Sequence, residues 1–169
     1  MTITTKIDGF CIRYAEEHDV PNILHYIREL AKFEDELEYV KADEETIHES
    51  LFVRKAAEVI FGEYKNEKIG FAVFHQNFST FLEKPGINLV DLYIEPEMRN
   101  HGFGNEMLSY LALITNERNC GRLEWWVHDW NTEAKRFYKR IGSNEVDKTR
   151  VFRLTGNELK EYGESFNGK

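Results

Sequence analysis

The chain has little cysteine and no long hydrophobic run. Its two cysteines, Cys11 and Cys120, are too few for a disulfide framework and indicate free or buried thiols in a reducing cytoplasm. No apolar stretch is long enough to span a bilayer. The N-terminus, Met1-Thr-Ile-Thr-Thr-Lys-Ile-Asp, lacks the apolar core of a signal peptide. These absences predict a cytoplasmic protein.

Positive charge is also scarce, because 22 Lys and Arg stand against 30 Asp and Glu, for a net charge of −8. That balance disfavours nucleic-acid binding, which needs a basic surface. It suits either the attraction of cationic small molecules or solubility alone. The six histidines show no metal-ligand spacing, so no metal is expected.

The composition, 41% hydrophobic and 14% aromatic, is typical of a globular protein. The length fits one domain over residues 1–169. We expect its core at about residues 10–156, with a tail at 157–169 that frays.

Both common phosphate-binding motifs are missing. The chain has no Gly-x-Gly-x-x-Gly fingerprint and no P-loop with its Lys-Ser/Thr pair. In their place, a strand-like run ends at Pro96 and is followed by Arg99-x-x-Gly102-x-Gly104 and a helical pattern. Glycines let a backbone approach an anion, and a helix start offers unpaired N–H groups and partial positive charge. The order predicts a diphosphate site, against the alternative of a turn with incidental glycines.

Hydrophobic periodicity predicts strands that first pair as hairpins and then alternate with helices. This favours an α/β sandwich with a mixed central sheet and helices on both faces. Strands are expected over residues 10–14, 59–64, 69–74, 87–94, 123–127 and 146–154, with turns at 65–67 and 84–86. Four helices are expected. The first has Asp19 as N-cap and apolar residues at 23, 24, 27, 30 and 31, and the second begins near Asp43. The third has an apolar face of Met107, Leu108, Leu111 and Ala112, and the fourth is capped by Thr132 and ends at Gly142.

A second motif lies downstream of the glycine turn. It is Arg122-Leu-Glu-Trp-Trp-Val-His-Asp-Trp-Asn131, followed by Ala134, Phe137, Tyr138 and Gly142. Together with the turn it resembles the GCN5-related N-acetyltransferase (GNAT) superfamily, and within it the branch of diamine (spermidine/spermine) N-acetyltransferases. The segments Ile27-Arg-Glu-Leu-Ala-Lys-Phe-Glu34 and Gly70-Phe-Ala-Val-Phe extend the resemblance, which covers residues 12–154.

The resemblance implies an acetyl-CoA-dependent enzyme and a homodimer. The acetyl group would pass to a primary amine of a small cationic acceptor, such as a diamine, a polyamine or a lysine-like molecule, by direct attack on the thioester. Two other functions stay open: an acyl-CoA-binding regulatory domain with weak or no catalysis, and a protein or peptide N-acetyltransferase.

The resemblance also assigns the cofactor site. Tyr138 would be the general acid for the leaving thiolate, although its apolar helical position alone favours core packing. The strand backbone of Leu92, Tyr93 and Ile94 would bind pantetheine. The diphosphate would be bound by Arg99, Asn100, His101, Gly102, Phe103, Gly104 and Asn105. The cofactor's other side would be lined by Asn131, Thr132, Glu133 and Ala134.

The acceptor site is expected at Phe33 and Glu34, which match residues of the branch that contact the polyamine. A carboxylate suits a cationic amine and an aromatic ring adds a cation–π contact, while an ordinary acidic loop is the alternative. Further candidates for substrate binding, each with a packing role as the alternative, are Val90, Glu124, Trp125 and Trp126.

One departure from the branch affects the chemistry. The branch usually has a glutamate, as proton acceptor, at the position of Val90. Asp91 is not expected to replace it, because neighbouring strand residues point to opposite faces. Three alternatives remain: another base, which would be Glu34, Glu124, His128 or an ordered water; catalysis by positioning alone; or acetyl-CoA binding without efficient transfer. Asn100 and His101 also depart from the branch's usual residues.

Overall fold

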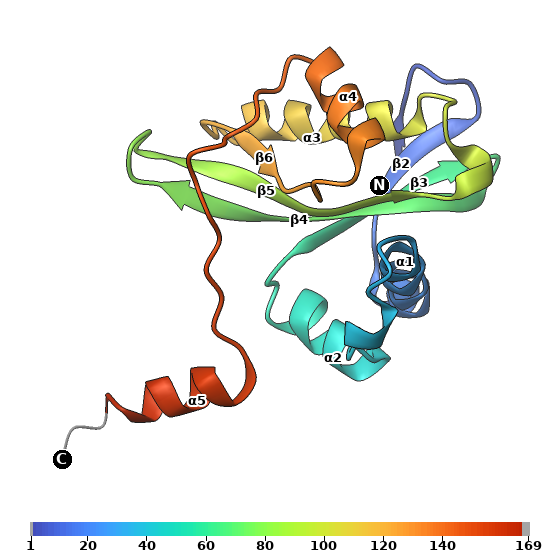
Figure 1. Ribbon diagram of the computed structural model, residues 1–169. Coiled ribbons are helices and arrows are strands. Elements are labelled where there is room, and N and C mark those ends of the chain that lie inside the picture. Colours follow the sequence, from blue (N-terminus) through green and yellow to red (C-terminus); the bar gives the residue numbers. More distant parts are fainter. Residues whose placement is uncertain (1, 167–169) are drawn as a thin grey trace. The chain divides into compact units, whose positions relative to one another are not determined.

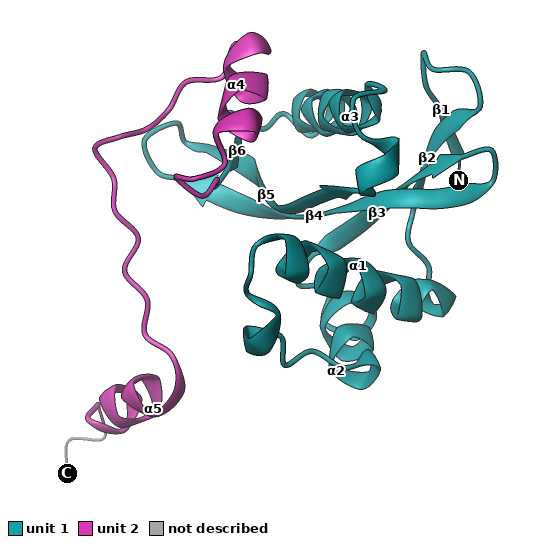
Figure 2. Cartoon of the chain, turned by 45° about the vertical axis from the view of Figure 1, so that its right-hand side comes forward, with its two compact units in different colours: residues 1–126 teal, residues 127–169 magenta. Residues whose placement is uncertain are grey.

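The computed structural model describes residues 2–166. The chain divides into two compact units, residues 1–126 and residues 127–169 (Figure 2). The first contains a six-stranded sheet in the order β1-β2-β3-β4-β5-β6 among the described residues. Its strands are β1 Thr2–Thr4, β2 Phe10–Tyr14, β3 Glu58–Tyr64, β4 Glu67–Ser79, β5 Lys84–Ile94 and β6 Leu123–Trp125.

Successive strands from β1 to β5 pair antiparallel, and β6 pairs with β5 in parallel. Helices α1 (Val20–Phe33) and α2 (Glu44–His48) cover one face of the sheet, and α3 (Phe103–Glu117) covers the other (Figure 1). Single helical turns lie at Glu17–Asp19, Leu37–Tyr39, Glu49–Val53 and Pro96–Met98. The predicted α/β sandwich with a mixed sheet is therefore confirmed. Among the described residues, no helix has the length and apolar character that crossing a membrane requires.

The core beneath the sheet is formed by the apolar face of α1. Ile23 and Tyr26 are buried against Phe61, Phe71 and other side chains of the sheet. Burial of this apolar surface stabilises the packing of the helix on the sheet by roughly 25 cal/mol for each Å² removed from water. On the opposite face, Met107, Leu108 and Leu111 of α3 are buried as predicted. Ala112 is exposed, contrary to the prediction, because the buried stripe continues to Ile114 at the next i+3 position.

The two hairpin turns had different outcomes. Lys65 and Asn66 both adopt positive φ between β3 and β4, as in the favoured two-residue hairpin turns, so this predicted turn is confirmed. The turn expected at 84–86 is wrong, because β5 already begins at Lys84 and Pro85 lies opposite Phe78. A proline is tolerated at such an early strand position, and the chain reverses instead at residues 80–83.

The ladder between β4 and β5 contains a bulge at Val90. Phe74 pairs with Leu89, whereas the preceding residue of β4, Val73, pairs with Asp91, so Val90 is the extra residue. The guanidinium of Arg118, just past α3, lies over the ring of Phe74, whereas Val73 belongs to the apolar core between α1 and the sheet. Because paired residues share a face, Leu89 faces α3 and Asp91 faces α1. Strict alternation along β5, on which the exclusion of Asp91 as a replacement base depends, therefore fails at this point.

The second unit contains α4 (Thr132–Arg140) and α5 (Gly156–Glu164). The strand expected over residues 146–154 is absent, although the structure describes all of residues 143–155, and it shows no regular structure there. A lone strand is not stable without a partner to complete its hydrogen bonds. The tail expected to fray is helical through Glu164, and residues 167–169 lie outside the described part.

Candidate active site

The parallel strands β5 and β6 pair only over a short length. The ladder joins Ile87 with Leu123, Asn88 with Glu124 and Leu89 with Trp125, and it ends there. From Val90 to Ile94, the edge of β5 on this side has no strand beside it among residues 2–166. An open strand edge offers backbone N–H and C=O groups to an extended ligand, in the way that one strand adds to another.

The open edge leads directly into the glycine turn. Gly102 is the N-cap of α3 and has φ +87°, a left-handed conformation that glycine adopts without strain. A Cβ at Gly104 would meet only ordinary contact, with Ile94 Cγ1 at 3.7 Å, so the fold does not require glycine there. The first N–H groups of α3 have no acceptor within the helix, which leaves them available to an anion.

Arg99 lies between the edge and the turn, with its side chain held in place. Its Nε donates a hydrogen bond to the carbonyl of Ile94 at 2.9 Å. Its guanidinium carbon lies 4.6 Å from the ring centre of Phe33 and 5.5 Å from that of Tyr93. No described residue accepts a hydrogen bond from its terminal Nη groups. These stacked contacts position a cation beside the helix start and bring Phe33, at the end of α1, to the same place.

A pocket of about 200 Å³ lies beneath the sheet, between β4, β5, α1 and the segment that contains α2. Among the described residues that line it, Asp91 alone is ionisable; the others are Ile23, Ile27, Ala42, Thr46, Ile47, Ser50, Leu51 and Val73. Burial and, to a smaller extent, the negative charge of Glu34 together raise the pKa of Asp91 to about 6. The site therefore contains a desolvated carboxylate that titrates near neutral pH.

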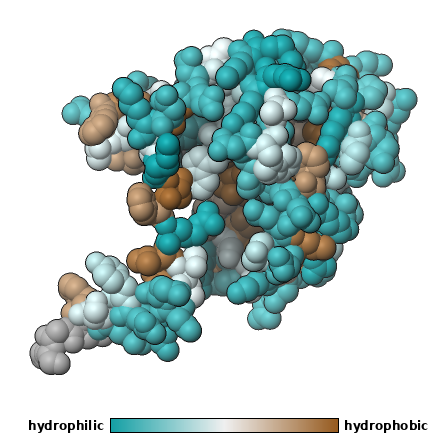
Figure 3. Space-filling view, viewed as in Figure 1, coloured by the Kyte–Doolittle hydropathy of each residue, from teal (hydrophilic) through white to brown (hydrophobic). Residues whose placement is uncertain are grey.

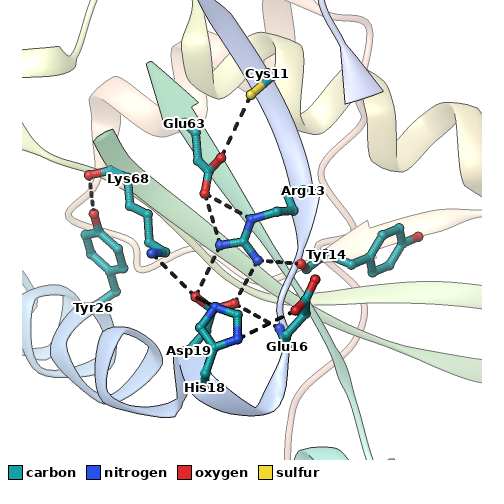
Figure 4. Close-up of polar contacts among 9 residues, drawn as sticks. All are labelled: Cys11, Arg13, Tyr14, Glu16, His18, Asp19, Tyr26, Glu63 and Lys68. Carbon is teal, nitrogen blue, oxygen red and sulfur yellow. Dashed lines mark hydrogen bonds and ion pairs between the residues drawn. The ribbon is translucent and has the colours of Figure 1, made fainter. Parts of the chain in front are cut away.

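A polar network fixes the start of α1 to the sheet (Figure 4). Asp19, fully buried, accepts hydrogen bonds from Arg13 Nη1 at 2.7 Å and Nη2 at 3.1 Å, and Lys68 Nζ lies 3.4 Å away. Glu63 accepts from Arg13 Nε at 3.0 Å. Burial acts to raise the pKa of Asp19, but the bonds from Arg13 and from the Glu16 N–H outweigh it and lower the pKa to about 2. Asp19 is at the N-cap position as predicted, but its side chain binds Arg13 and does not cap α1.

On β6, the predicted acceptor residues have unequal surroundings. Glu124 accepts a hydrogen bond from Asn77 Nδ2 at 2.7 Å and pairs with Arg122 at 3.1 Å, so its charge is already compensated. That makes Glu124 a poor candidate for the missing base. Trp125 is half-buried, and Trp126, just past the strand, is 69% exposed.

The second unit contains the remaining predicted residues. Asn131, not Thr132, is the N-cap of α4, because its side-chain oxygen accepts a hydrogen bond from the Ala134 N–H at 3.1 Å. Thr132 is the first helical residue, and Glu133 follows it. Burial raises the pKa of Tyr138. The ring of His128 stacks on Trp130 with a centroid distance of 5.6 Å.

In the first unit, the predicted residues Leu92, Tyr93, Ile94 and Arg99 lie along the segment that leads into the turn from Asn100 to Asn105. The predicted residues at the end of α1 join them, because Phe33 lies against Arg99 and Glu34 acts on Asp91. Sequence reasoning missed the pocket carboxylate of Asp91 and the Arg13–Asp19 network. A signal for Asp91 was hard to find, because β5 is buried on both faces between Gly86 and Leu89 and its hydrophobic pattern does not reveal a bulge.

Residues 23–142 match the acetyltransferase (GNAT) family, and the chain belongs to this family. Family members are N-acetyltransferases, and the chain is therefore an enzyme of this kind. A thialysine N-epsilon-acetyltransferase from Bos taurus is 30% identical over 162 residues, which cover 89% of this chain and 95% of that protein. A human spermidine/spermine N(1)-acetyltransferase-like protein is 30% identical over 92% of this chain and 24% of its own length. An Arabidopsis thaliana L-ornithine N5-acetyltransferase is 36% identical over 54% of this chain and 40% of that protein.

Solved structures share the fold at lower identity. An integron cassette protein from the mobile metagenome of V. cholerae superposes with a TM-score of 0.78 at 23% identity, over 92% of this chain and 98% of that one. A metagenomic aminoglycoside acetyltransferase superposes with a TM-score of 0.74 at 17% identity, over 88% and 97%.

Proposed function

We propose that the chain transfers the acetyl group of acetyl-CoA to a primary amine of a small cationic acceptor. The observation that carries this proposal is the open edge of β5, which begins at Val90 and leads into Arg99 and the start of α3. An extended pantetheine arm would pair with the backbone of Leu92 and Tyr93. The diphosphate would meet Arg99 and the N–H groups from Asn100 to Asn105, with Gly104 allowing close approach.

The acceptor class follows from the named relatives and from charge. The relatives are named for acetylating thialysine, ornithine and spermidine or spermine, all of which carry a primary amine on a flexible chain. A net charge of −8 attracts such cations from solution. Glu34 would contact a second positive group of the acceptor, and Phe33, Trp125 and Trp126 would contact its chain.

Transfer would proceed by direct attack. The amine nitrogen forms a bond to the thioester carbonyl carbon, the carbon–sulfur bond breaks, and the sulfur takes a proton from the Tyr138 hydroxyl. Burial raises the pKa of Tyr138, which keeps the hydroxyl protonated at neutral pH. We carry this role over from the Asn131–Tyr138 motif, whose Thr132, Glu133 and Ala134 would line the cofactor.

We further propose that the enzyme is a homodimer. Apolar side chains are exposed along the C-terminal arm of residues 143–155, including Phe152 at 95%, and Figure 3 shows hydrophobic surface along it. Folded monomers rarely leave such a patch uncovered. Light scattering after gel filtration would report the mass, and Phe152→Asp should shift it toward the monomer. A monomeric wild-type enzyme at micromolar concentration would contradict the proposal. We also propose a cytoplasmic location, which the free thiols of Cys11 and Cys120 support because such thiols are typical of reducing compartments.

The proposed reaction is tested by measuring acetyl-CoA consumption with putrescine, spermidine, spermine, lysine, thialysine, ornithine and short peptides, with product masses confirmed. Turnover of a small amine is expected. Turnover of peptides alone would replace the small acceptor by a protein N-terminus or lysine. No turnover, combined with a rise in melting temperature on adding acetyl-CoA, would leave a binding-only domain.

A further inference from the structure

The pocket beneath the sheet and the open strand edge meet at Asp91. Its backbone belongs to the edge that begins at Val90, and its side chain lines the pocket formed with α1 and α2. The bulge produces this arrangement, because it turns Asp91 toward α1 two residues after Leu89, which faces α3. An acceptor that reaches the edge from the pocket therefore has its reacting end next to this carboxyl group.

The surroundings of Asp91 leave few alternatives for its role. The residues that line the pocket with it are aliphatic or carry a hydroxyl, and none is a cation. The one charge identified as acting on it is Glu34, at the end of α1, which has the same sign. A buried carboxylate is normally paired with a cation, as Asp19 is with Arg13. No described lining residue therefore gives Asp91 a cationic partner, and the ammonium group of a ligand would be one.

We propose that Asp91 binds the acceptor's ammonium group in this pocket and accepts its proton, the role for which the resembled branch uses a glutamate at the position of Val90. The inference rests on the proposed acetyl transfer and names the group that prepares the amine for attack. Val90 is 52% exposed and has no carboxylate, so the proton acceptor is displaced by one residue along the bulged strand.

The protons balance as follows. One proton passes from the ammonium to an oxygen of Asp91, and the freed lone pair forms the carbon–nitrogen bond. When the carbon–sulfur bond breaks, the sulfur takes the proton of the Tyr138 hydroxyl. The second proton lost by nitrogen as the amide forms restores that hydroxyl through solvent. Asp91 then releases its proton to solvent, so that one proton leaves for each ammonium acetylated.

Titration supports this role. A carboxyl group whose pKa is raised to about 6 is ionised at pH 7.5, yet it is a stronger base than an ordinary aspartate. The groups to consider are Asp91 and Glu34, because the pocket faces of α1, α2 and β4 contribute no other ionisable side chain among the described residues. The rate should therefore fall on the acid side as Asp91 becomes protonated.

The decisive variant is Asp91→Asn, which retains shape and removes the charge, with Asp8→Asn on the exposed β1–β2 turn as the control. For spermidine or thialysine, kcat should fall by about 10²–10⁴-fold and KM should rise. The acid limb of the pH profile of kcat/KM, expected near pH 6, should disappear. Asp91→Glu should recover part of the rate. An active Asp91→Asn enzyme with its acid limb intact would overturn the inference.

A second measurement separates proton transfer from simple charge attraction. A fluorinated amine that is already neutral at pH 7.5 needs no base, so Asp91→Asn should slow its acetylation much less than that of spermidine. An equal loss for both acceptors would overturn the proton-accepting role.

Failure of the proposed function would look different. If the wild-type enzyme acetylates none of the amines, calorimetric measurement of spermidine binding still tests whether Asp91 binds the ammonium group. Equal affinity of the wild type and Asp91→Asn for spermidine would then overturn the inference, and loss of binding in the variant alone would support the pocket.

Discussion

Glu34, at the end of α1, lies near enough to Asp91 on β5 for its negative charge to raise the pKa of Asp91, beyond the larger effect of burial. Glu34→Gln should therefore lower that pKa and move the acid limb of kcat/KM to lower pH. The displacement should be less than about one pH unit, because burial, the larger cause, remains. Glu38→Gln, on the exposed turn that follows, is the control. A limb that stays in place or moves to higher pH would contradict this coupling.

The charge of Asp91 should also reduce the stability of the fold. A carboxyl group with a pKa of about 6 in the folded state and an ordinary value of 3.8 binds its proton more tightly when folded. The free energy of unfolding should then fall as pH rises from about 4 to 6, by up to about 3 kcal/mol at 1.36 kcal/mol per pKa unit. Asp91→Asn should remove this slope and raise the melting temperature at pH 7.5. Urea titrations at pH 4.5 and 7.5 would measure it, and a variant less stable than wild type at pH 7.5 would contradict it.

Asp19 should have the opposite effect. Its folded pKa of about 2 is below the ordinary 3.8, so it stabilises the protein above about pH 4, and this contribution is lost as pH falls through 2. Asp19→Asn leaves Arg13 and Lys68 without their buried counter-charge and should cost about 3–5 kcal/mol at pH 7. Chemical denaturation against Asp8→Asn as the control measures the difference. A loss below about 1 kcal/mol would mean that the network contributes little to stability.

The sequence predicted much of the fold and part of the site, for physical reasons that particular residues illustrate. The face of α1 at Ile23 repeats with helical period, and Gly102 has the backbone freedom that its left-handed turn requires. The bulge at Val90 has no comparable sequence signal, because it depends on how β5 pairs with β4. The expected strand at 146–154 has the right residues, but local pattern does not say whether a partner strand is available.

Asp19 and Asp91 illustrate the same limit for charged residues. Both are aspartates near apolar segments, yet one lies beside Arg13 and the other lines a pocket without a cation among its described lining residues. Their pKa values move in opposite directions as a result. Such differences arise from contacts between residues distant in sequence, which spacing and composition do not reveal.

Gly104 allows binding to be separated from folding. A Cβ there would have ordinary contact with Ile94, so Gly104→Ala should change the free energy of unfolding by less than about 1 kcal/mol. If the backbone of this turn approaches the diphosphate, the added methyl group should weaken acetyl-CoA binding at least about tenfold, which is 1.4 kcal/mol. Calorimetry with CoA would measure the affinity. Gly163→Ala, in α5 with open space around it, is the matched control. Unchanged affinity would remove Gly104 from the cofactor site.

Tyr138 allows proton donation to be separated from binding. Tyr138→Phe retains the ring and removes the hydroxyl, so turnover should fall by about 10²-fold or more while the affinity for CoA stays nearly constant. Tyr162→Phe, on the exposed face of α5, is the control for losing a tyrosine hydroxyl in the same unit. A donor thioester with a more acidic thiol releases its thiolate without protonation, so its reaction should lose much less rate in the variant. Equal losses with both thioesters would show that the hydroxyl acts at another step, and undiminished turnover would remove Tyr138 from the mechanism.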